Sequence, residues 1–300
     1  MPLVSLGQLL QDARRGGYAV CYCESWNLES LQAVLESAEE MESPIIVGFN
    51  GGFLSHPSRP QPENLAFYAG MGLLAVREAA VPVAFLLNET DSLSQIARGL
   101  DLGFNAVMVE SVHLELEPYR QLVKEVVALA HARNVFVEGQ VGHLPDGRDG
   151  PDGDGQITDP ATARAFVEET GIDALSVSIG NIHVLTKGKA SVDLEALRRI
   201  QAEITIPLVV HGGTSFPPEY AGAVISLGVA KFNFGTVLKQ AYLAAIRNKL
   251  AGYHEPMNPH VFLGVGGEQD IMAAGRGAVK LKVKELIRVY GFAGKVTRGK

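Results

Sequence analysis

Cysteine is scarce in this 300-residue sequence, which contains only Cys21 and Cys23. Two cysteines only two positions apart in one probable strand cannot easily pair with each other, so no disulfide framework is expected. The first residues, MPLVSLGQLLQDARRGG, lack the uninterrupted apolar core of an export signal and predict a short amphipathic helix instead. Two thiols without an export signal favour the reducing cytoplasm.

The sequence also lacks an excess of positive charge and a long apolar run. It has 26 Lys and Arg against 33 Asp and Glu, a net charge of −7. A broad electropositive surface for nucleic acid is therefore not expected, although a local cationic pocket for a small anion remains open. No apolar run is long enough to cross a bilayer. Neither nucleic acid nor a membrane is expected as a partner.

Short Val-, Ile- and Leu-rich runs alternate with longer amphipathic stretches along the whole chain. Strands are expected at 18–23, 44–49, 82–87, 105–109, 134–138, 173–179, 206–210 and 230–234. Helices are expected at 28–41, 62–79, 91–102, 115–132, 159–170, 193–203, 217–227, 236–249 and 268–290. Strands that are apolar on both faces suit a parallel sheet covered by helices.

Eight strand–helix units predict an α/β fold, a (β/α)8 TIM barrel. An open doubly wound sheet is the alternative. No low-complexity linker divides the chain, so we expect one domain over 1–300. The barrel would occupy about 18–250, after an N-terminal helix, and a C-terminal helical extension would occupy 251–300.

One segment, GHLPDGRDGPDGDGQ at 142–156, is too rich in Gly and Asp to pack as a helix or strand. We interpret it as a flexible lid loop that carries Asp146, Arg148 and Asp149. A calcium loop is the alternative, but the spacing of an EF-hand is absent.

Polar and charged residues gather at or just after the predicted strand ends. In chain order these are Glu24, Asn50, Asn88, Glu89, Glu110, Glu138, Gln140, His183, His211 and Asn233. In a TIM barrel the carboxyl ends of all eight strands meet on one face, where active sites lie. The pattern therefore predicts a site on that face.

Glu89, His183 and His211 together form a set of metal ligands. One carboxylate and two imidazoles suit zinc most, with manganese, iron(II) or cobalt as alternatives, and leave a coordination position open. Taken singly, His183 could be an ordinary loop histidine and Glu89 a helix N-terminal acid.

Two glycine-rich turns predict a phosphate site. HGGTS at 211–215 and NFGT at 233–236 each follow a strand and precede a helix, so their N–H groups can face an anion. Loops after strands seven and eight form the usual phosphate site of such barrels. The simpler alternative is that these glycines only permit tight turns.

Three stretches carry a resemblance to a known family. These are ITDPATARAFVEETGIDALSVSIGNIHVLTKGKASVDLEAL at 157–197, IPLVVHGGTSFP, and VAKFNFGTVLKQAY. The sequence resembles the class II, metal-dependent ketose-bisphosphate aldolases, which include fructose- and tagatose-bisphosphate aldolases, over nearly its whole length. The resemblance implies a TIM barrel, a divalent metal, a phosphorylated sugar substrate, and a homodimer or homotetramer.

The resemblance also implies roles for single residues. His183 and His211 match metal-binding histidines of the family, and Lys187 matches the lysine of the following loop. The residues that match its phosphate- and substrate-binding loops are Gly212, Thr214, Asn233, Gly235 and Thr236. Gly213, which lies between two of them, and Asn50, which stands where the family has a Ser, are also expected to bind phosphate or substrate.

The departures from the family pattern fall at its metal-binding and proton-transfer positions. Glu89 stands where the family has a metal-binding histidine, and Asn88 stands where it has an acid/base aspartate. Arg148 stands where the family loop carries a proton-abstracting glutamate. An amide cannot shuttle a proton, so Glu24 and Glu110 become the candidates for proton transfer.

Three functions are consistent with these residues. The first is a metal-dependent lyase that cleaves or forms a carbon–carbon bond in a phosphorylated ketose through an enediolate, with an altered substrate or altered proton-transfer residues. The second is a metal-dependent sugar-phosphate isomerase or epimerase, because enediolate chemistry does not require bond cleavage. The third is an inactive, aldolase-like binding protein.

Overall fold

Eight parallel strands close into a barrel in the order β1-β2-β3-β4-β5-β6-β7-β8, in a computed structural model that describes residues 2–110, 114–145, 155–182 and 188–296. The strands are β1 (Val20–Glu24), β2 (Ile45–Asn50), β3 (Val83–Thr90), β4 (Ala106–Val109), β5 (Phe136–Val141), β6 (Ala174–Val177), β7 (Leu208–Val210) and β8 (Val229–Phe234). The prediction of a (β/α)8 barrel is confirmed.

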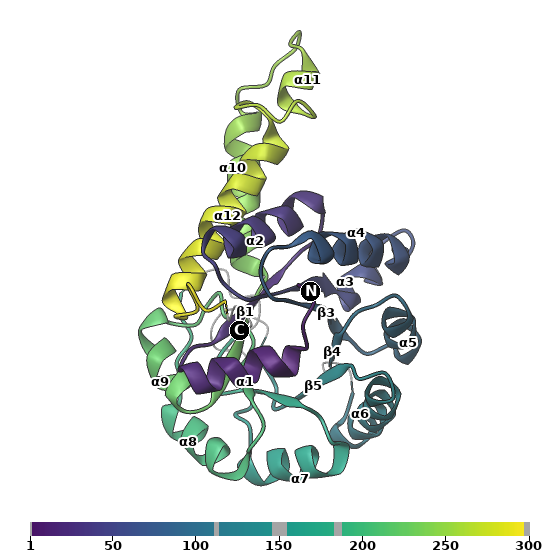
Figure 1. Ribbon diagram of the computed structural model, residues 1–300, viewed down its shortest axis with the longest axis vertical. Coiled ribbons are helices and arrows are strands. Elements are labelled where there is room, and N and C mark those ends of the chain that lie inside the picture. Colours follow the sequence, from purple (N-terminus) through teal and green to yellow (C-terminus); the bar gives the residue numbers. More distant parts are fainter. Residues whose placement is uncertain (1, 111–113, 146–154, 183–187, 297–300) are drawn as a thin grey trace.

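Helices surround the barrel (Figure 1). They are α1 (Leu6–Gly16), α2 (Leu28–Glu40), α3 (Gly51–Leu54), α4 (Leu65–Glu78), α5 (Leu93–Asp101), α6 (Leu116–His131), α7 (Pro160–Thr170), α8 (Leu194–Glu203), α9 (Ala221–Ser226), α10 (Thr236–Leu250), α11 (Pro259–Phe262) and α12 (Ile271–Val289). Side-chain caps fix several starts: Asn27 forms a capping box with Ser30, and Asp159 caps α7 before Pro160. The short helices α3 and α11 were not predicted.

The N-terminal helix α1 closes the amino end of the barrel. Leu3 pairs with Val83, the first residue of β3, and the helix packs against β1, β3 and β8. Leu6, Leu9 and Leu10 are buried by this packing. The carboxyl end of the strands stays available for a site.

Three polar residues that were expected after strands lie inside them. β3 continues through Thr90 and β5 through Val141, so Asn88, Glu89 and Gln140 belong to the strands themselves. The register between β3 and β4 shifts between Leu87 and Thr90, and Glu89 has a positive φ of 50°. A bulge of this kind re-aims side chains, and here it falls at Asn88 and Glu89.

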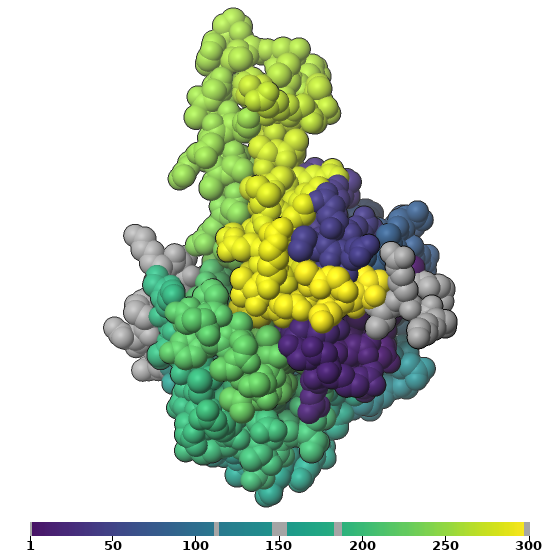
Figure 2. Space-filling view, turned by 60° about the vertical axis from the view of Figure 1, so that its left-hand side comes forward, coloured from purple at the N-terminus to yellow at the C-terminus, as the bar shows by residue number. Residues whose placement is uncertain are grey.

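A helical hairpin formed by α10 and the C-terminal extension projects beyond the barrel. α10 and α12 pack along each other and carry α11 at the far end (Figures 1 and 2). α12 also packs on α2, where Lys280 and Lys284 pair with Glu40. The predicted C-terminal helix is confirmed.

Cys21 and Cys23 are buried free thiols. Among the helices in the described part of the chain, none has the length and apolar character needed to cross a membrane.

Candidate active site

A cavity of about 230 Å³ opens at the carboxyl end of the barrel. It brings together predicted site residues from four parts of the chain: Glu24, Asn88, Glu89, Gly212, Thr214, Asn233, Gly235 and Thr236. Residues that lie far apart in the sequence thus share one small space. Their convergence supports a site on the face that the barrel topology predicted.

Glu89 and His211 face each other in this site. Nδ1 of His211 lies 3.4 Å from Oε1 of Glu89, and both side chains are almost completely buried. Metal–ligand bonds of about 2.0–2.1 Å in a tetrahedral site place two ligand atoms roughly 3.3 Å apart. The spacing of the pair therefore fits two ligands of one cation, and it is longer than an ordinary hydrogen bond.

Hydrogen bonds to neighbouring side chains hold both Glu89 and His211 in position. The amide of Asn50 donates to Oε2 of Glu89 at 2.6 Å, and Nε2 of His211 lies 2.8 Å from Oε1 of Glu138. A neutral ring that donates its Nε2 proton to Glu138 would leave the Nδ1 atom on the side of Glu89 able to bind a cation, as supporting carboxylates do for metal-binding histidines.

Burial alone lowers the pKa of His211, but the hydrogen bond to Glu138 and the nearby Glu89 carboxylate outweigh it and raise this pKa to about 8. Without a cation, the ring is therefore largely protonated at neutral pH. A bound cation would have to displace the Nδ1 proton, so its affinity should rise with pH.

A buried ion pair supports His211. Nζ of Lys231 lies 2.8 Å from Oε2 of Glu138, and both side chains are inaccessible to solvent. Lys231 also donates to Oδ1 of Asn233 at 2.6 Å, and Nδ2 of Asn233 lies 3.4 Å from Oδ1 of Asn88. Lys231 was not among the expected site residues, but Glu138 links it to the site.

The two glycine-rich turns meet at the start of α10. Gly212 has a positive φ of 68°, and the hydroxyl of Thr214 accepts a hydrogen bond from the N–H of Val237 at 3.0 Å. The N–H of Gly213 donates to the carbonyl of Asn233 at 3.1 Å. The turn after β7 is thus joined to both β8 and α10, with backbone N–H groups at a helix N-terminus, where anions bind.

Gly213→Ala should distort this loop. A Cβ atom there would lie 2.8 Å from the carbonyl oxygen of Asn233 and 2.6 Å from the Phe234 ring. We expect a loss of about 1–3 kcal/mol in the free energy of unfolding and weaker binding of inorganic phosphate, measured by thermal denaturation and calorimetry. Gly70→Ala on α4, where a Cβ would meet nothing within 4 Å, is the control and should leave phosphate binding unchanged.

Other predicted residues lie elsewhere. Asn50 lines an adjoining cavity, and Glu110 is not among the described residues that line either cavity. His183, Lys187, Asp146, Arg148 and Asp149 lie outside the described residues. Within the described ranges, no group of three or more His, Cys, Asp or Glu forms a metal site, and Glu89 and His211 are the two expected ligands that can be placed.

Tyr22 is a site residue that sequence reasoning missed. It lines the cavity, is 1% exposed, and its hydroxyl has no hydrogen-bond partner among the residues the structure describes. Burial and the nearby Glu24 and Glu89 carboxylates raise its pKa well above the ordinary value, so the phenol stays protonated. The sequence feature that could have identified Tyr22 is its position two residues before Glu24, which places both side chains on the same face of β1. An unsatisfied buried hydroxyl is costly, and a bound ligand is one way to satisfy it.

Comparisons with known proteins agree with the fold. The family model of class-II fructose-bisphosphate aldolase matches residues 4–295. The chain belongs to the class II fructose-bisphosphate aldolase family. A fructose-bisphosphate aldolase from Geobacillus stearothermophilus is 34% identical over 306 residues, covering 99% of this chain and all of the relative. One from Staphylococcus epidermidis is 33% identical and covers 97% of this chain and 98% of the relative.

The family's structures share the fold as well. The crystal structure of the YdjI aldolase from Escherichia coli K12 has a TM-score of 0.80 at 28% identity, covering 98% of this chain and 99% of that one. The resemblance seen in the sequence motifs is thereby confirmed. The family is one of aldolase-type lyases. The bulge in β3 falls at Asn88 and Glu89, the two positions where the sequence motifs predict departures from the family pattern.

Proposed function

We propose that this protein is a metal-dependent aldolase-type lyase that cleaves or forms a carbon–carbon bond in a phosphorylated ketose. The observation that carries the proposal is the 3.4 Å approach of Glu89 and His211 beside the glycine-rich turns. A cation bound by this pair would then lie in the same cavity as the anion site at the glycine-rich turns. A ketose phosphate has a carbonyl that can bind the cation and a phosphate that can bind at the anion site.

Glu89 and His211 would hold the cation, with His183 as the expected third ligand. Zinc suits a set of one carboxylate and two imidazoles, and manganese, iron(II) and cobalt are the alternatives. When bound, such a cation polarises the ketose carbonyl and stabilises negative charge on its oxygen. Glu138 and Asn50 keep the two side chains in place.

Cleavage requires one proton to leave and one to arrive. A base takes the proton of the hydroxyl on the carbon that will leave. As the carbon–carbon bond breaks, this carbon becomes the aldehyde. The bonding electron pair passes to the keto fragment as an enediolate, whose carbon then takes up a proton. We assign the proton transfers to Glu24, which lines the cavity, with Glu110 as the alternative. Asn88 orients the substrate by hydrogen bonding.

Metal titration tests this proposal directly. The purified protein should bind one zinc or manganese ion per chain by calorimetry, and Glu89→Ala and His211→Ala should each weaken that binding at least about tenfold. Phe67→Ala, at a side chain on α4 that is 75% exposed, is the control. A retro-aldol assay across phosphorylated ketoses should show metal-dependent turnover. Unchanged thermal stability with every divalent metal and no turnover would favour the inactive binding protein instead.

We also propose that the chain, as a single domain, assembles into a homodimer or homotetramer through the α10–α12 hairpin. Leu263 and Val265, which follow α11 at the far end of the projecting hairpin, are more than half exposed, as is Leu281 on α12. Apolar side chains gathered on one projecting element suit an interface. The two free thiols support a cytoplasmic location.

A further inference from the structure

A second cavity, of about 410 Å³, opens beside the candidate active site. Glu24, Phe53, Lys239 and Leu243 line both cavities, so the two are adjacent. A substrate whose phosphate lies at the start of α10 therefore has room to extend past Glu24 into the second cavity. This volume exceeds the cavity of about 150 Å³ that holds a benzene molecule.

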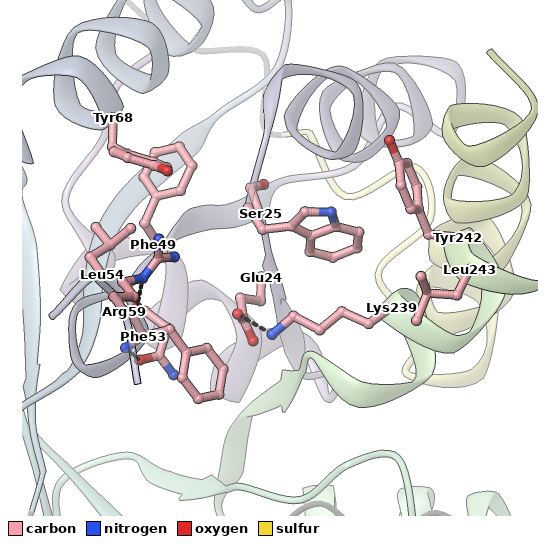
Figure 3. A pocket seen from close by; sticks show the side chains of 12 residues that line it. Glu24, Ser25, Phe49, Phe53, Leu54, Arg59, Tyr68, Lys239, Tyr242 and Leu243 are labelled. Atoms are coloured by element: carbon pink, nitrogen blue, oxygen red, sulfur yellow. Dashed lines mark hydrogen bonds and ion pairs between the residues drawn. The ribbon is translucent and has the colours of Figure 1, made fainter. Parts of the chain in front are cut away.

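Aromatic side chains form opposite walls of this cavity (Figure 3). On one side Trp26 packs edge-to-face on Tyr242 at 5.4 Å, and on the other Phe49 packs edge-to-face on Tyr68 at 5.2 Å. Such paired rings are held rigidly and present flat apolar surfaces. The walls suit a ligand with an apolar C–H face.

The cations of the cavity are already paired with carboxylates of this chain. Nζ of Lys239 lies 2.5 Å from Oε1 of Glu24 and 4.3 Å from the centre of the Phe53 ring. Arg59 pairs with Glu63 at 2.5 Å and donates to the carbonyl of Phe53 at 2.6 Å. A phosphate entering here would have to displace Glu24, whose side chain is only 9% exposed, and would be repelled by its charge.

These features favour one of three classes of ligand and disfavour the other two. A second phosphate is disfavoured by the buried carboxylate of Glu24. A purely hydrocarbon group is disfavoured because it would remove water from Glu24 and Lys239 without replacing the lost hydrogen bonds. An uncharged group with hydroxyls can bond to Glu24 and Lys239 while its C–H face packs on the rings.

We propose that the second cavity holds an uncharged, hydroxylated sugar portion, so that the substrate is a ketose monophosphate rather than a bisphosphate. This inference rests on the proposed function, which supplies the phosphate anchor at the start of α10. It makes Glu24, Phe53 and Lys239 determinants of specificity at the end of the substrate remote from that phosphate.

A matched pair of uncleavable ligands tests the inference. D-glucitol 1-phosphate and D-glucitol 1,6-bisphosphate have no carbonyl and differ only in the second phosphate. In calorimetry with the zinc-loaded full chain, the monophosphate should bind at least about tenfold more tightly. Glu24→Gln should shrink that preference by improving bisphosphate binding, and Phe53→Ala should weaken monophosphate binding. Phe67→Ala, on the exposed face of α4, should change neither affinity.

Dihydroxyacetone phosphate, which reaches only the first cavity, separates the possible failures. If it binds but the bisphosphate binds as tightly as the monophosphate, or if Glu24→Gln leaves the preference unchanged, the second cavity is not a sugar subsite and the proposed function stands. If dihydroxyacetone phosphate does not bind even with zinc or manganese present, the proposed function fails and the inference about the second cavity fails with it.

Discussion

Lys231→Met is expected to lower the free energy of unfolding by about 3–5 kcal/mol, because it leaves Glu138 as a buried carboxylate without its lysine. Both side chains are inaccessible to solvent, and their charged atoms lie 2.8 Å apart. Metal affinity should fall as well, since Glu138 also orients His211. Chemical denaturation and zinc titration of the variant measure the two effects.

The double variant Lys231→Met, Glu138→Leu is the matched control for stability. Removing both charges of the pair leaves neither partner as an unpaired buried ion, so stability should return most of the way to that of the original chain. Zinc affinity should stay low, because His211 still lacks its carboxylate. A double variant that is as unstable as Lys231→Met alone would show that packing volume, not charge, causes the loss.

The pH dependence of the single variant follows from Glu138. Burial raises the pKa of this carboxyl, but Lys231 and His211 outweigh burial and hold the pKa below its usual value of 4.5. A depressed pKa contributes stability that is present above pH 4.5 and is lost as the pH falls through the lower, folded-state value. Because Lys231→Met removes the largest of these lowering influences, its stability deficit should shrink as the pH falls below 4.5.

The strand and helix pattern was predictable because it depends on apolar periodicity and caps. Val-, Ile- and Leu-rich runs marked all eight strands, and residues such as Asn27 and Asp159 marked helix starts. Strand ends were less predictable, because Asn88, Glu89 and Glu138 are polar and their burial depends on partners from other strands. A sequence does not show that Lys231, 93 positions beyond Glu138, neutralises it.

The candidate site was predictable in outline for a topological reason. Once eight parallel strands are expected, their carboxyl ends must meet, and Asn233, Glu89 and Gly212 must lie near one another. The second cavity was not predictable, since its walls combine Trp26 after β1, Phe53 on α3 and Tyr242 on α10. Those side chains meet only because the projecting helix α10 begins at the rim of the barrel.

Asn88→Asp is expected to raise kcat for ketose cleavage by about 10²–10⁴-fold, the range that a positioned acid or base contributes. The family pattern implies an acid/base aspartate at this position, and aspartate has nearly the shape of asparagine. Oδ1 of Asn88 already accepts from the amide of Asn233, and that amide can donate equally to a carboxylate. The measurement is steady-state cleavage of a ketose phosphate with zinc bound.

Two controls make the result specific to proton transfer. Asn64→Asp, at the exposed cap of α4, introduces the same charge at a residue that lines neither cavity and should leave kcat unchanged. Zinc affinity should be measured in parallel, because a carboxylate beside Glu89 also changes the charge near the cation. If Asn88→Asp leaves kcat unchanged while zinc stays bound, proton transfer at this position does not limit the rate. The chain would then use a different group, with Glu24 the first to replace, because it lines the same cavity.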